Sequence, residues 1–62
     1  MLVAGNVSQF KNGWVTFKSN ATDNEYDFYI GTEDKIKKNS EVRIYLEGRH
    51  IKHVWINKKK YR

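Results

Sequence analysis

The dipeptide Asn12-Gly13 constrains the fold of this chain more than any other local feature. Both residues accept the positive φ angles of a type I′ turn, which joins two strands through only two residues. The flanking segments, Phe10-Lys11 and Trp14-Val15, contain the aromatic and β-branched residues that strands favour. The sequence therefore predicts a tight β-hairpin at this point.

Similar short runs, rich in Val, Ile, Thr, Phe, Tyr and Trp, continue along the chain between clusters of Gly, Asn, Asp and Ser. We expect five strands, at Leu2–Phe10, Trp14–Lys18, Tyr26–Ile30, Val42–Glu47 and Ile51–Asn57. This order predicts an all-β fold in which residues 1–57 form one small five-stranded barrel and residues 58–62 form a basic C-terminal tail. Closure of the barrel would remove exposed strand edges.

A short helical turn is expected between the third and fourth strands. Thr32 is a suitable N-cap, Glu33 and Asp34 follow it, and Lys37 and Lys38 come last. Acids at the start and bases at the end suit the helix dipole. Because the segment has only one large apolar residue to bury, the prediction is limited to one or two turns.

The length of 62 residues allows one domain with a thin core, so folding must rely on burying aromatic and aliphatic side chains. The chain has no Cys, and therefore no disulfide and no thiolate ligand. It shows neither a signal-peptide pattern nor an apolar run of membrane-spanning length. We expect a cytoplasmic protein with no membrane partner.

Strand alternation sorts the side chains of the middle strands into an aliphatic inner set and a mixed outer set. The outer set contains three aromatic residues, Trp14, Tyr29 and Tyr45, together with the cations Lys18 and Arg43. Aromatic rings interleaved with cations on one face of a barrel are typical of single-strand nucleic-acid binding, because bases stack on the rings and the cations hold phosphates.

The first and last strands do not alternate cleanly. In the first, Phe10 breaks the parity of the preceding apolar residues, which predicts a bulge near Ser8-Gln9. In the last, apolar residues occupy both parities, so that Trp55 is compatible with either the core or the surface.

Positive charge is concentrated at the C-terminal end. Residues 1–48 contain six Lys or Arg and seven Asp or Glu, a net charge of −1, whereas residues 49–62 contain six Lys or Arg and no acid, a net charge of +6. A localised basic patch is the usual electrostatic mark of a nucleic-acid binder. The candidate nucleic-acid-binding residues are Lys11, Trp14, Lys18, Tyr29, Arg43, Tyr45, Arg49, Lys52, Trp55, Lys58, Lys59 and Lys60.

Four short motifs carry a family resemblance. They are Gly5-x-Val7-x-x-Phe10, Gly13-Trp14-x-x-Phe17, Asp27-Phe28-Tyr29-Ile30 and Val42-Arg43-Ile44-Tyr45-Leu46-Glu47-Gly48. In this order they resemble a shortened cold-shock domain, which is an oligonucleotide-binding (OB) barrel. The resemblance implies that Trp14 occupies the first stacking position of the second strand and Tyr29 the aromatic stacking position of the third.

The chain also departs from that pattern. Thr16 stands where the family has a second aromatic residue, Gly31 where it has a His, and Gln9 where it usually has a Trp. A small SH3-like barrel, which would grip duplex DNA or structured RNA through phosphates, has much the same strand count and stays open as an alternative.

No arrangement of residues in the sequence predicts catalysis, a cofactor or a metal site. His50 and His53 are the only histidines, and a spacing of three on a strand points them to roughly opposite faces. We therefore expect a non-catalytic nucleic-acid-binding domain that prefers single strands of DNA or RNA. The alternative from another class is a small protein-interaction module or inhibitor, with the acidic stretch 23–34 and the basic C-terminal end as opposed patches. The oligomeric state stays open.

Overall fold

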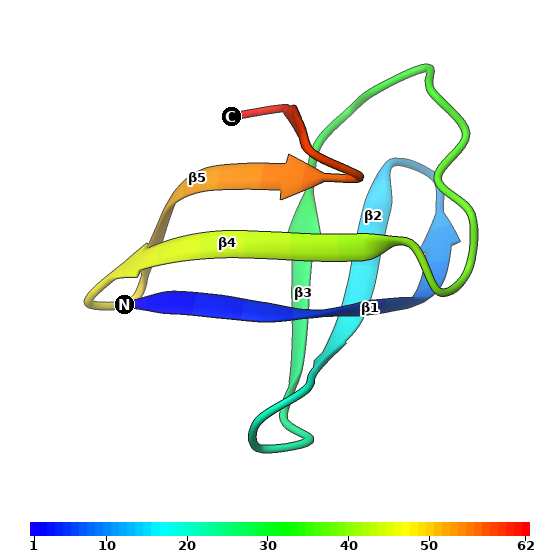
Figure 1. The fold of residues 1–62 in the computed structure, drawn as a ribbon. Helices are drawn as coiled ribbons and strands as arrows, with labels where there is room; N and C mark the ends of the chain where they lie inside the picture. Colours follow the sequence, from blue (N-terminus) through cyan, green and yellow to red (C-terminus); the bar gives the residue numbers. More distant parts are fainter.

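The computed structural model describes all 62 residues as one antiparallel sheet that curls into a half-barrel (Figure 1). Its six strands are β1 (Leu2–Lys11), β2 (Trp14–Ser19), β3 (Glu25–Tyr29), β4 (Glu41–Glu47), β5 (His50–Ile56) and β6 (Lys59–Lys60). They lie in the order β3-β2-β1-β4-β5-β6. The all-β prediction is confirmed, and a two-residue strand is added to the five expected. There is no helix, and hence none long and apolar enough to cross a membrane.

The long strand β1 belongs to both halves of the sheet. Residues 2–6 pair with β4, and residues 5–11 pair with β2. The register with β2 shifts between Val7 and Gln9, which confirms the bulge predicted near Ser8-Gln9. Beyond this bend the strands change direction, so that β4 and β5 run across β2 and β3 (Figure 1).

Ten apolar side chains form the core between the two halves. They are Val3, Val7, Val15, Phe17, Phe28, Ile36, Val42, Ile44, Val54 and Ile56. The inward sets predicted from alternation are confirmed in β2 and β4, where Val15, Phe17, Val42 and Ile44 are fully buried. Only Ile36 comes from outside the strands.

Two turns have the backbone of a type I′ hairpin. At Asn12-Gly13 the φ angles are 53° and 82°, as the dipeptide predicts. At Asn57-Lys58, which joins β5 to β6, they are 52° and 69°, so that a Lys occupies a left-handed position where Gly is the favoured residue. Asn57 is held there by its side chain, whose Oδ1 accepts a hydrogen bond from the Glu41 amide at 3.2 Å.

The predicted helical turn is wrong: residues 30–40 form a loop without helix. The loop begins as expected, since Thr32 Oγ1 accepts a hydrogen bond from the Asp34 amide at 3.1 Å. It then diverges because Asp34 is bound by residues of the C-terminal segment and Ile36 inserts into the core, with 8% of its surface exposed. A single inserted side chain and a bound carboxylate order the segment, whereas a helix this short gains too few hydrogen bonds to offset its nucleation.

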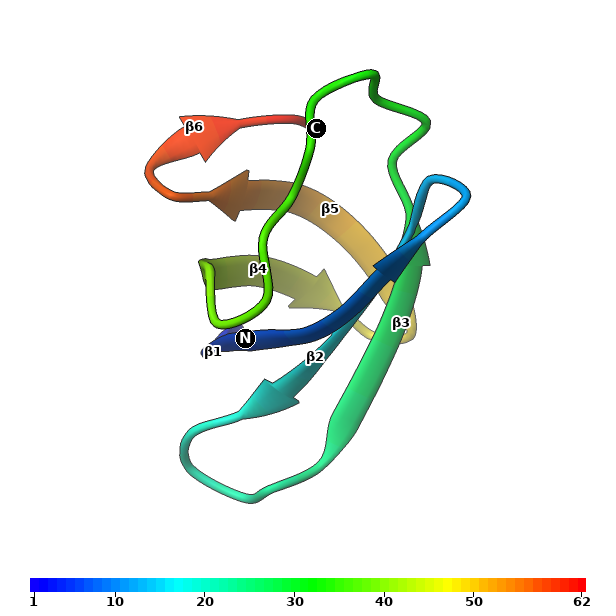
Figure 2. The ribbon, with the colours of Figure 1, turned by 90° about the vertical axis from the view of Figure 1, so that its right-hand side faces the viewer.

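Residues 58–62, which we expected as a basic tail, continue the sheet. β6 pairs with the end of β5, and beyond it the Tyr61 amide donates to the Val54 carbonyl at 2.8 Å. Arg62 bridges the open side of the half-barrel, because its guanidinium donates a hydrogen bond to the carbonyl oxygen of Tyr29 at the end of β3. In both views the C-terminal segment and the loop that leaves β3 occupy the upper part of the molecule (Figure 1 and Figure 2), where Lys59 and Tyr61 contact Asp34 of the loop. The sheet itself stays open, with β3 and β6 as its edges.

Candidate nucleic-acid interface

Trp14 and Tyr29 form an exposed aromatic pair on the outer face of β2 and β3. They are register partners, their ring centroids lie 5.6 Å apart at an interplanar angle of 59°, and their exposed fractions are 53% and 51%. Lys11 pairs with Trp14 from the other side and completes the row across the three strands. Two rings and a cation therefore share one accessible edge of the sheet.

Two glycines hold the Tyr29 ring in place. A Cβ on Gly13 would lie 2.7 Å from Tyr29 Cε1, and one on Gly31 would lie 3.0 Å from Cε2. Both glycines also have positive φ angles, 82° and 55°. The turn that makes the first hairpin thus also makes room for the ring. The position of the Tyr29 ring therefore depends on the absence of side chains at both glycines.

A second aromatic cluster lies on the outer face of β4 and β5. The ring centroids of Tyr45 and His53 are 6.3 Å apart, and those of His53 and Trp55 are 5.7 Å apart. Trp55 is half-buried and is in register with Arg43. Of the two positions that alternation leaves open, core or surface, Trp55 therefore lies on the outer face. His53 was not among the candidate residues. Its parity with Trp55 in β5 was visible in the sequence and is the feature that places it here.

The two clusters do not form one platform. Trp14 is in register with Lys11, near the C-terminal end of β1. Tyr45 is in register with Leu2, at the opposite end of this ten-residue strand. The outer set predicted as one face is therefore divided into two sites, one on each half of the barrel.

A shallow hollow adjoins the second cluster. It has a volume of about 400 Å³ and is lined by Leu2, Glu41, Arg43, Trp55 and Lys58. Arg43 Nε lies 3.5 Å from Glu41 Oε1, with both side chains about half exposed. Lys58 has no acidic partner, since the ion pairs of the chain are Arg43–Glu41 and Lys59–Asp34.

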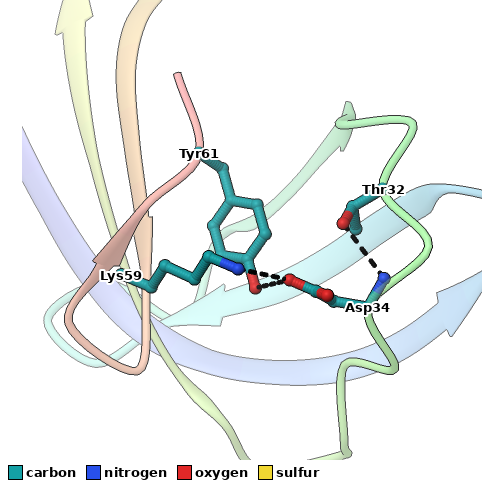
Figure 3. Close-up of polar contacts among 4 residues, drawn as sticks. All are labelled: Thr32, Asp34, Lys59 and Tyr61. Atoms are coloured by element: carbon teal, nitrogen blue, oxygen red, sulfur yellow. Dashed lines mark hydrogen bonds and ion pairs between the residues drawn. The ribbon is translucent and has the colours of Figure 1, made fainter.

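One of the C-terminal cations, Lys59, already forms an ion pair within the chain. Lys59 Nζ lies 2.7 Å from Asp34 Oδ2, and the Tyr61 hydroxyl donates to the same oxygen at 2.9 Å (Figure 3). The hydrogen bond from Lys59, assisted by that from Tyr61, holds the pKa of Asp34 below its ordinary value. The same bond raises the pKa of Lys59, and burial, followed by the bond to Asp34, raises the pKa of Tyr61.

The remaining cations of the C-terminal end are dispersed. Arg49 lies in the β4–β5 turn, Lys52 in β5 where the register with β4 shifts, and Lys60 opposite Trp55. Lys18 lies on β2 in register with Glu25. The cations of the basic C-terminal segment are therefore separated from one another in the structure, and Lys59 forms an ion pair within the fold.

This chain matches no protein-family model, no curated protein and no solved structure. What the two sites bind is therefore inferred from their own side chains.

Proposed function

We propose that this chain is a non-catalytic, OB-like domain that binds nucleic acid and prefers single strands. The observation that carries the proposal is the Trp14–Tyr29 pair, two exposed rings on adjacent strands with Lys11 beside them. Unpaired bases stack on such rings with about 1–3 kcal/mol per base. In a duplex the same base faces are covered by stacking within the helix.

The strand arrangement supports the OB-like form of this proposal. An OB barrel is a five-stranded, partly open Greek-key barrel that binds oligonucleotides on the face of strands 2 and 3. Here β1 lies between β2 and β4, and the exposed pair lies on β2 and β3. These features favour the OB-like form over an SH3-like one that grips duplexes through phosphates. With Thr16 and Gly31 at the neighbouring positions, the pair offers stacking for one or two bases.

Phosphate contacts at this site would come from three cations on or beside β1, β2 and β3. Lys11 is in the same row, Lys18 is on the same face of β2, and Arg62 is held against the backbone of Tyr29. Three contacts predict that log K falls with log[salt] at a slope of about −2 for a single strand.

The test uses a W55F chain, in which Trp14 is the only fluorescent indole. It is titrated with single-stranded DNA, single-stranded RNA and duplex DNA at two salt concentrations. We expect single strands to quench Trp14, and Tyr29→Ala to weaken their binding by about 1–3 kcal/mol without changing the salt slope. Tyr45→Ala is the matched control, because it removes another exposed tyrosine, 42% exposed against 51% for Tyr29, from the other half of the barrel.

Equal affinity of the Tyr29→Ala and Tyr45→Ala chains for single strands would contradict the stacking site. Salt-sensitive binding of duplex DNA without quenching of Trp14 would favour the SH3-like alternative. The comparison of DNA with RNA strands decides between those two ligands.

A protein partner is the second candidate, and the open edge of β3 is the observation that favours it. β3 has no strand on its outer side, and its exposed residues include Glu25 and Asp27. An extended basic segment of another protein would complete the sheet there by adding a strand. Absence of nucleic-acid binding at low salt, together with a stable complex with a Lys- or Arg-rich β-strand peptide, would support this candidate.

A further inference from the structure

We infer that the hollow beside Trp55 is a second binding site, for a nucleoside phosphate. It lies on the opposite half of the barrel from Trp14 and Tyr29, and it combines an aromatic wall with two cations. Its volume of about 400 Å³ is within the range of small-molecule sites. The inference goes beyond the proposed single-strand site and does not depend on it.

The aromatic part of the ligand follows from the walls around Trp55. The indole is half-buried, so its position is fixed by packing while part of it faces the hollow. Leu2 adds an apolar wall, and Ala4, the register partner of Arg43, adds only a methyl group on this face. A planar base could stack on the indole and also contact the apolar side chain of Leu2.

The anionic part of the ligand follows from the charged side chains around the hollow. Arg43 and Lys58 border the hollow, and the one acid there, Glu41, is already paired with Arg43. The lining therefore carries a net positive charge, and Lys60 adds a further cation opposite Trp55. A guanidinium beside an ammonium is suited to phosphate oxygens, the first through paired hydrogen bonds and the second as a point charge.

The backbone at Lys58 points to the same conclusion. Its φ of 69° is a left-handed angle that disfavours side chains, and the position is the second central residue of a type I′ turn, where Gly is preferred. The chain thus carries a strained Lys where a stable turn calls for Gly, and strain of this kind tends to mark ligand contacts. In this turn Lys58 is one of the residues that line the hollow.

The test uses a W14F chain, in which Trp55 is the only fluorescent indole, titrated with AMP. Adenosine, ribose 5-phosphate and inorganic phosphate serve as partial ligands, and a 5′-phosphorylated oligonucleotide tests whether the nucleotide is taken free or at a strand end. We expect AMP to quench Trp55 with saturation. Arg43→Gln and Lys58→Gly should each weaken AMP binding about tenfold, through the loss of one charged contact of about 1.5 kcal/mol.

The controls separate binding from folding. Lys35→Gln removes an exposed cation of the loop between β3 and β4, which lines neither site, and should leave AMP binding unchanged. Lys58→Gly is expected to relieve the strain of the turn, and thermal unfolding of that variant, measured beside its affinity, separates a lost contact from a lost fold. Unchanged affinity in both Arg43→Gln and Lys58→Gly would overturn the inference, as would equal binding of AMP and inorganic phosphate, which indicates a simple anion site. Because the W55F chain reports only Trp14, failure of this site leaves the single-strand proposal standing, and the reverse also holds.

Discussion

Gly5 approaches Lys18 so closely that a Cβ at Gly5 would collide with the Lys18 carbonyl oxygen. This contact occurs where β1 pairs with both neighbours, since Gly5 is in register with Ser19 of β2 and Val42 of β4. The bend of the sheet therefore depends on the absence of a side chain at this position.

We predict that Gly5→Ala destabilises the domain by about 2–3 kcal/mol, because the obstructing atom belongs to the backbone and the strands must separate to admit a methyl group. Thermal unfolding followed by circular dichroism measures the effect. Gly48→Ala is the control: nothing lies within 4 Å of a Cβ there, and only its φ of 63° opposes the substitution. A Gly5→Ala midpoint no lower than that of Gly48→Ala would contradict the steric explanation.

Ile44 supports the core from the centre of β4, where it is fully buried. Ile44→Val should lower the free energy of unfolding by about 0.5–1.5 kcal/mol, and Ile44→Ala by about 2–5 kcal/mol. The larger truncation removes more buried apolar surface and leaves a larger cavity, which the surrounding side chains fill only in part. In a domain of this size the larger loss approaches the whole free energy of folding. Urea unfolding of the three chains tests the series, and similar stabilities of wild type and Ile44→Ala would show that this position does not carry the core.

Asp34 connects the loop to the C-terminal segment, and its contribution to stability should depend on pH. Because its folded-state pKa is lowered, the contribution is present above the unfolded value of about 3.9 and is lost as the pH falls through the folded value. The raised pKa of Lys59 implies a contribution that is present below about pH 10.4 and is lost as the pH rises through the folded value.

Asp34→Asn should therefore lower the melting temperature near neutral pH, by a small amount because the pair is exposed, and the difference from wild type should shrink as the pH falls through the folded-state pKa of Asp34 and vanish below it. Asp27→Asn, which removes an exposed acid without an ion pair, is the control. A difference that persists unchanged at low pH would show that Asp34 acts through something other than its charge.

Lys58→Gly should stabilise the domain by about 1 kcal/mol, because Gly adopts the left-handed angle of this turn without steric strain. Lys60→Gly, two residues on and within β6, should instead destabilise it, since Gly weakens a strand. Chemical denaturation distinguishes the two. A Lys58→Gly chain that is less stable than wild type would mean that the lysine side chain contributes more to the fold than its backbone angle costs.

The strands were predictable because their causes are local. Asn12-Gly13 defines the first hairpin, and the alternation of Val42, Ile44 and Leu46 against Arg43 and Tyr45 defines the buried face of β4. The bulge in β1 was also predictable, since the parity of its apolar residues changes within the strand.

The features that depend on residues distant in the sequence could not be predicted from local patterns. β6 is made of lysines and is a strand only because β5 provides hydrogen bonds to it. Asp34 lies 25 residues from Lys59, and their contact replaced the helix expected from local capping. In the candidate site, the exposure of Trp14, Tyr29 and Tyr45 followed from alternation, but their division between two halves follows from how β1 is shared.

Because β1 is shared between the two halves of the sheet, the chain is suited to division into two fragments that reassemble. Residues 1–30 contain β1 to β3, residues 40–62 contain β4 to β6, and the strands of the two pieces meet only along the pairing of β1 with β4 (Figure 2). Each piece alone leaves half of the core in water, so neither reaches the stability of a folded domain. A cut in the loop between them would therefore yield two fragments that fold on each other, and their reassembly would report whether two fused partners have met.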